Sequence, residues 1–248
     1  MTTPASAPSA PVALVTGASR GLGRALAVAL ADRGWRLIVD ARRPGPLEEA
    51  GAELSSRTAV VALAGDVADP GHRRSLAAAV ERSGRLDLLV NNASVLGPSP
   101  LVPLADHPAE TLDDVLLVNT VAPLALLQAV IPILRRSRGR VINVSSDAAV
   151  EAYPGWGGYG ASKAALDQLS AVLAVEEPEL RIYAVDPGDM NTDLHQQAFP
   201  GEDISDRPPP ESAVPALLRL VEGDLPSGRY QASALLAGLR AAGEPVPS

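Results

Sequence analysis

A tyrosine and a lysine four residues apart, Tyr159 and Lys163, are the side chains whose types and spacing best fit acid–base chemistry. On a helix, residues at this spacing lie on one face, so the phenol and the ammonium would be neighbours. A nearby ammonium favours the phenolate and is expected to lower the pKa of the tyrosine toward working pH. Such a tyrosine can pass a proton to or from a carbonyl or alcohol oxygen. The pattern alone also fits an exposed pair on an ordinary helix.

A glycine-rich turn near the start of the chain predicts a dinucleotide-binding site. The apolar run Pro11–Thr16, typical of a buried parallel strand, is followed by Gly17, Gly21 and Gly23, and then by apolar residues at helical spacing over Arg24–Arg33. Glycines allow the backbone to approach a pyrophosphate, and the helix N-terminus offers N–H groups and a positive dipole end. The alternative is a tight turn with glycine caps.

Polar residues follow two further predicted strands. A strand that ends at Val90 is followed by Asn91–Ala93, and one that ends at Val144 is followed by Ser145 and Ser146. Ligands bind at the carboxyl ends of strands in open α/β sheets, so these positions are expected to line a site. Each pair could also serve in turns or caps.

Strands alternate with helices along the chain, which predicts an α/β fold: a single-domain, Rossmann-type, doubly wound parallel sheet flanked by helices. The expected helices are 24–33, 70–83, 112–134, 160–174 and 211–221. The expected strands are 12–16, 36–39, 59–64, 86–90, 141–144 and 181–185, with a last strand led in by Ser227.

One catalytic domain is predicted over residues 11–240, between a flexible tail at 1–10 and a frayed end at 241–248. The tail is rich in Ala, Ser and Pro and lacks the basic region and apolar core of a signal peptide. The polar, proline-rich segment 196–210 is expected to be either a lid over the substrate or disordered.

Composition argues against several classes of protein. The chain has no cysteine, so disulfide and thiolate chemistry are excluded, and its three histidines form no metal-ligand pattern. A net charge of −8 argues against binding to nucleic acid or to an anionic membrane. No apolar stretch is expected to span a bilayer. These features predict a cytoplasmic protein with no metal site.

Taken in order, the motifs resemble the classical short-chain dehydrogenase/reductase family from Val12 to about Thr192. Gly155-Trp156, Val175–Pro178 and Thr192–Leu194 are further similar to its sepiapterin-reductase-like branch of carbonyl and diketone reductases. The motifs that carry the family resemblance are Thr16-Gly17-x-x-x-Gly21-x-Gly23, Asp66-Val67, Asn91-Asn92-Ala93, Asn119, Ser146, Tyr159 with Lys163, and Pro187-Gly188 followed by Thr192.

The resemblance implies four catalytic residues. Tyr159 would be the general acid and base, and Lys163 would lower its pKa and bind the nicotinamide ribose. Ser146 would hold the substrate oxygen, with Ser145 as the competing candidate. Asn119 would hold a water that links Lys163 to solvent.

The resemblance also implies how the cofactor is bound. Asp66 would bond the adenine, Asn91 and Ala93 would line the cofactor, and Thr192 would bond the carboxamide. Ser94 stands where the family usually has glycine. The full expected set is Gly17, Ser19, Arg20, Gly21, Leu22, Gly23, Arg42, Asp66, Val67, Asn92, Ala93, Tyr159, Lys163, Pro187, Gly188 and Thr192.

NADP is favoured over NAD as the cofactor. Counted from Gly34, Arg42 occupies the position that selects NADP in the resembled family, and Arg20 is the second basic position. Two guanidinium groups suit the extra phosphate of NADP. Asp40 is the opposing feature, since a carboxylate there could repel that phosphate or bind the ribose of NAD.

The predicted function is hydride transfer between nicotinamide and a small ketone, diketone or secondary alcohol. Two alternatives stay open: a dinucleotide-sensing regulatory protein on the same fold, and an NAD-dependent alcohol dehydrogenase. A homo-oligomer, dimer or tetramer, is expected. The candidate substrate residues are Leu96, Asp147, Tyr153, Trp156, Met190 and His195, with Phe199 as a cover.

Overall fold

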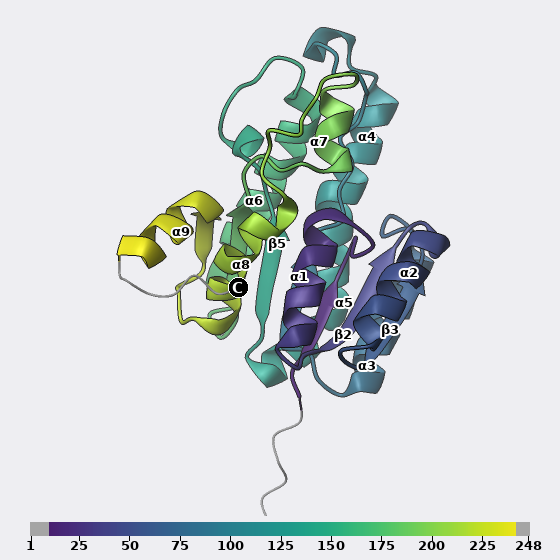
Figure 1. Ribbon diagram of the computed structural model, residues 1–248, viewed down its shortest axis with the longest axis vertical. Helices are drawn as coiled ribbons and strands as arrows, with labels where there is room; N and C mark the ends of the chain where they lie inside the picture. Colours follow the sequence, from purple (N-terminus) through teal and green to yellow (C-terminus); the bar gives the residue numbers. More distant parts are fainter. Residues whose placement is uncertain (1–9, 242–248) are drawn as a thin grey trace, which may run out of the picture.

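The computed structural model describes residues 10–241, and a parallel sheet of seven strands runs through its centre (Figure 1). The strand order β3-β2-β1-β4-β5-β6-β7 contains the order of the doubly wound dinucleotide-binding folds, so the predicted fold class is confirmed. Residues 1–9 and 242–248 of the predicted tail and frayed end lie outside the described residues. The strands are β1 (Val12–Val15), β2 (Arg36–Ala41), β3 (Val60–Ala64), β4 (Leu88–Asn91), β5 (Arg140–Val144), β6 (Arg181–Asp186) and β7 (Gly228–Gln231).

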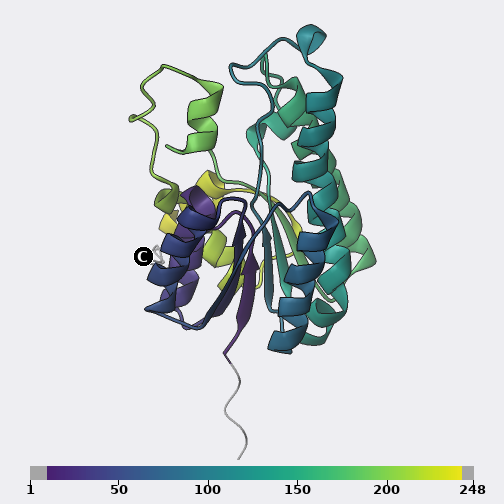
Figure 2. The same cartoon turned by 90° about the vertical axis from the view of Figure 1, so that its right-hand side faces the viewer.

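Helices cover both faces of the sheet, as the two layers in Figure 2 show. α1, α2 and α8 lie on one face, and α3, α5 and α6 lie on the other. The helices are α1 (Gly21–Asp32), α2 (Pro44–Ser55), α3 (Pro70–Ser83), α4 (Ala109–Leu116), α5 (Ala122–Ser137), α6 (Gly157–Glu176), α7 (Asp193–Ala198), α8 (Val214–Glu222) and α9 (Ala232–Ala241).

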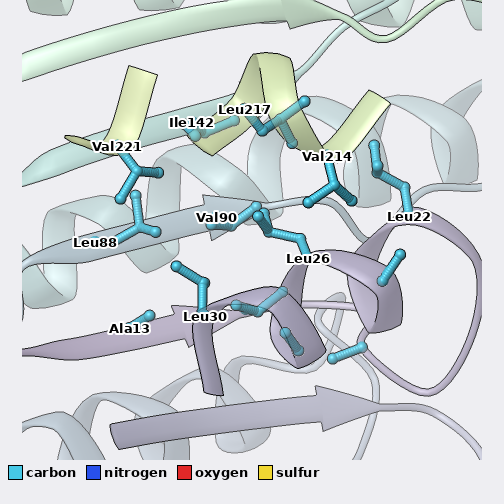
Figure 3. Packing of buried hydrophobic residues seen from close by; sticks show 14 of the residues in the cluster. Ala13, Leu22, Leu26, Leu30, Leu88, Val90, Ile142, Val214, Leu217 and Val221 are labelled. Carbon is cyan, nitrogen blue, oxygen red and sulfur yellow. The ribbon is translucent and has the colours of Figure 1, made fainter. Parts of the chain in front are cut away.

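The central strands are continuous apolar runs because both of their faces are covered. All four residues of β1 and of β4 are buried. On one face, Leu26 and Leu30 of α1 pack with Leu88 and Val90 of β4 and with Leu217 of α8 (Figure 3). This packing fixes the start of α1, and with it the glycine turn, against the carboxyl ends of the strands.

A π-helical turn, Leu117–Val121, joins α4 to α5 where the sequence predicted one uninterrupted helix. Such turns are rare and frequently lie at functional sites. This one contains Asn119, which is fully buried. The long helix is therefore interrupted at one of the predicted catalytic residues.

The sequence predicted that no apolar stretch could span a bilayer. When length and composition are the only criteria, this prediction was wrong. Among the described residues, the helical stretch Ala109–Ser137 is long and apolar enough to meet those criteria. Its apolar residues have partners within the fold, since Leu126, Val130 and Leu134 pack in a core cluster with α3. A core helix passes the same test.

Three helices were absent from the predicted set: α2, α7 and α9. α7 overlaps the start of the segment 196–210, which was expected to be a lid or disordered. α2 begins with Pro44-Gly45-Pro46, which looks like a turn, but proline suits the first position of a helix because its missing N–H would be unpaired there anyway. α9 occupies 232–241 and includes the first residue of the predicted frayed end. Leu235 and Leu239 of α9 are buried, so this helix packs against the rest of the domain.

Candidate active site

A cleft of 1080 Å³ opens at the carboxyl ends of the strands. Its walls come from the glycine turn, the segments that follow β2, β3, β4, β5 and β6, the start of α6, and α7. The cleft therefore gathers the polar positions that the sequence predicted at strand ends.

The glycine turn is shaped so that side chains would not fit. Gly17 and Gly21 have positive φ angles of 67° and 55°, which glycine adopts without strain. A Cβ on Gly23 would lie 2.5 Å from the carbonyl oxygen of Gly17. Arg20, the N-cap of α1, makes no side-chain cap bond, so the first N–H groups of the helix have no side-chain acceptor there. An N-terminus of this kind fits the pyrophosphate of a dinucleotide.

Asn92 supports this turn from behind. Its Nδ2 donates to the carbonyl oxygens of Thr16 and Gly17 at 2.8 and 3.2 Å. The Thr16 hydroxyl in turn accepts from the backbone N–H groups of Asn92 and Ala93, both at 3.0 Å. Both Asn92 and Ala93 line the cleft. The predicted contact of Asn91 was wrong, because its Nδ2 donates to Asn143 inside the protein at 2.8 Å and the residue does not line this cleft.

Asp40 also directs its side chain to the turn. One carboxylate oxygen accepts from the N–H of Gly17 at 2.8 Å, and the other lies 3.0 Å from Nε2 of His72. The side chain is 1% exposed, and this burial raises the pKa of the carboxyl above its ordinary value, against the opposing effect of the His72 hydrogen bond. Asp40 thus has an internal partner for each oxygen.

The predicted nucleotide residues lie along the same wall. Arg42 is exposed at the edge of the cleft, and the structure pairs it with no other described residue. Arg20 forms an ion pair with Asp193, at the start of α7. Asp66 accepts from the N–H of Ala68 at 2.8 Å, so it has the turn contact that was the alternative to an adenine contact, while it also lines the cleft. Ser19, Leu22 and Val67 line the cleft as well.

Tyr159, Lys163 and Ser146 meet at the base of the cleft. The side chains of Ser94 and Ser146 lie near the Tyr159 phenol, and both act to lower its pKa. Nζ of Lys163 lies 5.5 Å from the centre of the Tyr159 ring and donates to the carbonyl oxygen of Val144 at 2.8 Å. Ser146 is favoured over Ser145, because the Ser146 side chain influences the pKa of the Tyr159 phenol, whereas the Ser145 hydroxyl is buried and has no hydrogen-bond partner among the described residues.

The expected lowering of the Tyr159 pKa is not present in this structure. Burial raises the pKa of Tyr159 above its ordinary value. The nearby Ser94 and Ser146 side chains oppose this rise, whereas the charges of Asp147 and Asp186 add to it. Burial also lowers the pKa of Lys163 to about 8. The prediction considered only the attraction of the ammonium, and desolvation of both groups outweighs it.

Asn119 has a partner for every hydrogen-bonding position of its amide. The oxygen accepts from the Ser94 hydroxyl at 3.1 Å and from the N–H of Val95 at 2.9 Å. The nitrogen donates to the carbonyl of Val95 at 2.8 Å and to the Ser162 hydroxyl at 3.0 Å. The side chain therefore joins the loop after β4 to α6.

The segment after β6 forms the opposite wall of the cleft. Pro187, Gly188 and Thr192 line it, as predicted. The N–H of Gly188 donates to Asp186 at 3.0 Å. Thr192 is the N-cap of α7, and its hydroxyl accepts from the N–H of His195 at 3.3 Å. Thr192 thus fixes the start of the short helix α7 beside the glycine turn.

Acidic and aromatic side chains surround the predicted substrate position. Asp147 accepts from the Ser146 hydroxyl at 2.9 Å and from the Tyr153 hydroxyl at 3.0 Å. The Trp156 ring lies 5.7 Å from that of Tyr159 and 6.2 Å from that of Phe199, between centroids. Two further candidates, Met190 and His195, also line the cleft, whereas Leu96 lies in the apolar cluster below it.

Sequence reasoning gave no role to two residues that lie beside the predicted catalytic residues. Arg229 of β7 donates to the carbonyl oxygen of Ser146 and to Asp167, both at 2.9 Å. Ser94 donates to Asn119 at 3.1 Å and acts to lower the pKa of the Tyr159 phenol. The signal for Ser94 was available, since it stands where the resembled family usually has glycine. No local pattern marks Arg229.

Comparisons with known proteins agree with this geometry. The family model described as short chain dehydrogenase matches residues 11–203. Sepiapterin reductase from Mus musculus is 37% identical over 201 residues, which cover 75% of this chain and 77% of that protein.

Two solved structures share the fold over most of their length. A protein described as a short chain dehydrogenase from Shigella flexneri, complexed with NADP, has a TM-score of 0.82 and 28% identity, covering 90% of this chain and 97% of that chain. An alcohol dehydrogenase from the archaeon Thermococcus sibiricus, complexed with 5-hydroxy-NADP, has a TM-score of 0.80 and 27% identity, covering 90% and 96%. The chain therefore belongs to the short-chain dehydrogenase family of oxidoreductases, whose cofactor is a nicotinamide dinucleotide.

Proposed function

We propose that this protein is an NADP-dependent reductase of small ketones or diketones that uses Tyr159 as its general acid, and that it oxidises the corresponding secondary alcohols in reverse. The observation that carries the proposal is the position of Tyr159 and Lys163. Both are buried at the base of the cleft that begins at the glycine turn. A proton donor and a dinucleotide cradle thus share one cavity.

Each catalytic side chain has a task that its contacts support. Bound nicotinamide would supply the hydride. Tyr159 gives its proton to the substrate oxygen, and its raised pKa keeps the phenol protonated at neutral pH. Ser146 holds that oxygen after its hydroxyl turns away from Asp147, to which it now donates. Lys163 would bind the nicotinamide ribose, and Asn119 would support the water that links Lys163 to solvent.

The preference for NADP rests on Arg42 and on the direction of Asp40. Arg42 is exposed beside the cleft and is not paired with another described residue, so its guanidinium is available for a phosphate. Asp40 was the reason for doubt, but its oxygens face Gly17 and His72. A carboxylate with these partners is not directed at the ribose.

The substrate proposed here is small and partly apolar. Trp156 and Phe199 form an aromatic cover over Tyr159, and the substrate carbonyl would lie beneath it. The relative from Mus musculus is named for its activity on sepiapterin. Pterins therefore belong in the first set of substrates to be tested.

We also propose that segment 196–210 is a lid. Its first residues belong to α7, its Phe199 packs on Trp156, and the N–H of Asn191 donates to Pro208 at 2.8 Å. These contacts hold the segment over the substrate end of the cleft. Lids of this kind exclude water and complete the site when ligands bind.

Replacing Tyr159 with phenylalanine tests the general acid. Tyr159→Phe should keep the fold and cofactor binding, because only a hydroxyl is lost, and turnover should fall by roughly 10²–10⁴-fold or more. The measurement is NADPH oxidation against a panel of ketones, diketones, pterins and sugars. Tyr230→Phe is the matched control, since that hydroxyl bonds Pro226 away from the cleft. Turnover of Tyr159→Phe near that of the wild type would remove Tyr159 from the mechanism.

Replacing Arg42 with alanine tests the cofactor choice. Loss of one charge-assisted bond costs about 1.5–3 kcal/mol, so Arg42→Ala should bind NADPH roughly tenfold to a hundredfold more weakly and NADH almost unchanged. Dissociation constants for both cofactors can be measured by fluorescence titration. Arg57→Ala, an exposed arginine paired with Asp32, is the control. Equal weakening of both cofactors, or a wild type that already prefers NADH, contradicts the assignment.

The pH dependence should differ between the two directions. Reduction needs protonated Tyr159 and charged Lys163, and each form is present below the pKa of its group. Because the pKa of Tyr159 is raised and that of Lys163 is about 8, reduction should be constant up to about pH 8 and fall above it. Alcohol oxidation needs the phenolate and should rise with pH. A reduction rate that already falls between about pH 6 and 7 would be inconsistent with these groups.

Hydrogen exchange tests the lid. Backbone amides of 196–210 should exchange more slowly when NADP and a substrate analogue are both present, because the segment then packs against the bound molecules. Residues 130–137 of α5 serve as the internal control. Equal exchange with and without ligands would identify 196–210 as a passive surface loop.

A further inference from the structure

We propose that Arg229 is a positioning residue for Ser146: its guanidinium ties the main chain of Ser146 to α6, the helix that carries Tyr159 and Lys163. The inference rests on the proposed function, in which Ser146 holds the substrate oxygen and Tyr159 gives that oxygen a proton. Arg229 lies on β7, at one edge of the sheet, and does not line the cleft. It would therefore act on the reaction only through the residues that it holds.

The register of β7 directs Arg229 toward α6. Arg229 is paired with Ala184 of β6 in the parallel ladder. Successive residues of a strand point to opposite faces of the sheet. Tyr230, the next residue, packs with the core cluster on the face that α1 and α8 cover. The Arg229 side chain accordingly lies on the other face, where it meets Asp167 of α6.

Two nitrogens of the guanidinium make the connection. Nε donates to Oδ2 of Asp167, and Nη2 donates to the carbonyl oxygen of Ser146, both at 2.9 Å. Nη2 also lies 3.9 Å from Oδ2 of Asp186, the last residue of β6. Because the guanidinium is planar and its donors are fixed relative to one another, the two bonds hold Asp167 and Ser146 at a set separation.

Arg229 and Lys163 both join α6 to the end of β5. Lys163 reaches from α6 to the carbonyl oxygen of Val144 at 2.8 Å. Arg229 joins Asp167, one turn after Lys163 on α6, to the carbonyl of Ser146, just beyond Val144. The two connections are therefore adjacent on both elements. With the Lys163 contact alone, the main chain could still rotate after Val144, and the second contact restricts that rotation at Ser146.

The bond from Arg229 differs in kind from the other bond to the same carbonyl. The Ser146 oxygen also accepts from the N–H of Ala149 at 3.2 Å, within the short 3₁₀ turn Asp147–Ala149. That bond is local, so it moves together with Ser146 and does not fix its place in the fold. Arg229 is the donor that connects this carbonyl to a distant element.

The ion pair of Arg229 with Asp167 is sheltered from water. The two side chains are 27% and 14% exposed. The other oxygen of Asp167, Oδ1, is buried and has no hydrogen-bond partner among the described residues. Removing one partner of such a pair is costly, because the remaining charge has lost its counter-charge in a poorly solvated place. Loss of Arg229 would thus release both Asp167 and the Ser146 carbonyl.

The test compares Arg229→Gln and Arg229→Lys with the wild type in the full-length protein, using NADPH and a ketone that the wild type reduces. Arg229→Gln should lower kcat roughly tenfold to a hundredfold, because a charge-assisted bond is lost, with the KM for NADPH nearly unchanged. Arg229→Lys keeps the charge but not the planar pair of donors, so kcat should recover only in part. Arg140→Gln is the matched control and should keep kcat, since Arg140 donates to the main-chain carbonyl of Gly223 at 2.8 Å from the opposite end of β5.

Two readouts separate positioning from a merely structural role. Misplacement of Ser146 should slow hydride transfer, so deuterium at the transferred position of NADPH should reduce kcat at least as strongly in Arg229→Gln as in the wild type. In a Ser146→Ala background, Arg229→Gln should cause little further loss, since Arg229 acts through Ser146. Wild-type kcat in Arg229→Gln would overturn the proposal, as would a smaller isotope effect or losses that multiply in the double variant.

The outcomes also distinguish this inference from the proposed function. If Tyr159→Phe keeps full activity, the general acid is wrong and the inference about Arg229 fails with the proposed function. If Tyr159→Phe is inactive while Arg229→Gln keeps the wild-type kcat, only the inference fails. If Arg229→Gln does not fold, Arg229→Gln combined with Asp167→Asn carries the same test, because it removes the bond to Ser146 without leaving the Asp167 charge unpaired.

Discussion

The arrangement of the proposed catalytic residues depends on where one buried positive charge is held. Nζ of Lys163 donates to the carbonyl of Val144, the last residue of β5, and burial lowers the pKa of Lys163 from 10.5 to about 8. A change of this size means that burial destabilises the charged form by roughly 3 kcal/mol relative to water, yet with a pKa of about 8 the group is still mainly charged at neutral pH. This contact holds α6 against the end of β5. Tyr159, one turn earlier on α6, is thereby brought to Ser146, directly after β5.

The other end of the cleft is organised by polar side chains directed at the backbone. Asn92 and Thr16 hold the glycine turn to the end of β4, and Asp40 holds it to the end of β2. These bonds leave the first N–H groups of α1 directed outward, where an anion would lie. The residues that position the site are thus themselves hydrogen-bonded within the protein, as buried polar groups usually are.

Much of the fold could be predicted because the apolar strands, the glycine turn and the strand-end polar residues are local patterns. The remainder depended on contacts between distant segments. Asn91 and Asn92 are neighbours, and only the sheet determines which of them faces the cleft. The raised pKa of Tyr159 arises from burial by several elements, and the π-turn at Asn119 has no sequence signature. Ser94 and Asn119 are 25 residues apart, and their bond exists only in the folded chain.

The internal pairing of Asp40 separates two properties that a single acidic residue often combines. The shape of the glycine turn depends on Asp40, whereas the proposed discrimination between the two dinucleotides falls to exposed side chains such as Arg42. On that proposal, cofactor preference could change during evolution, or be redesigned, at the surface without disturbing the turn. A carboxylate near the end of the second strand would then be a misleading marker of the cofactor that this chain uses.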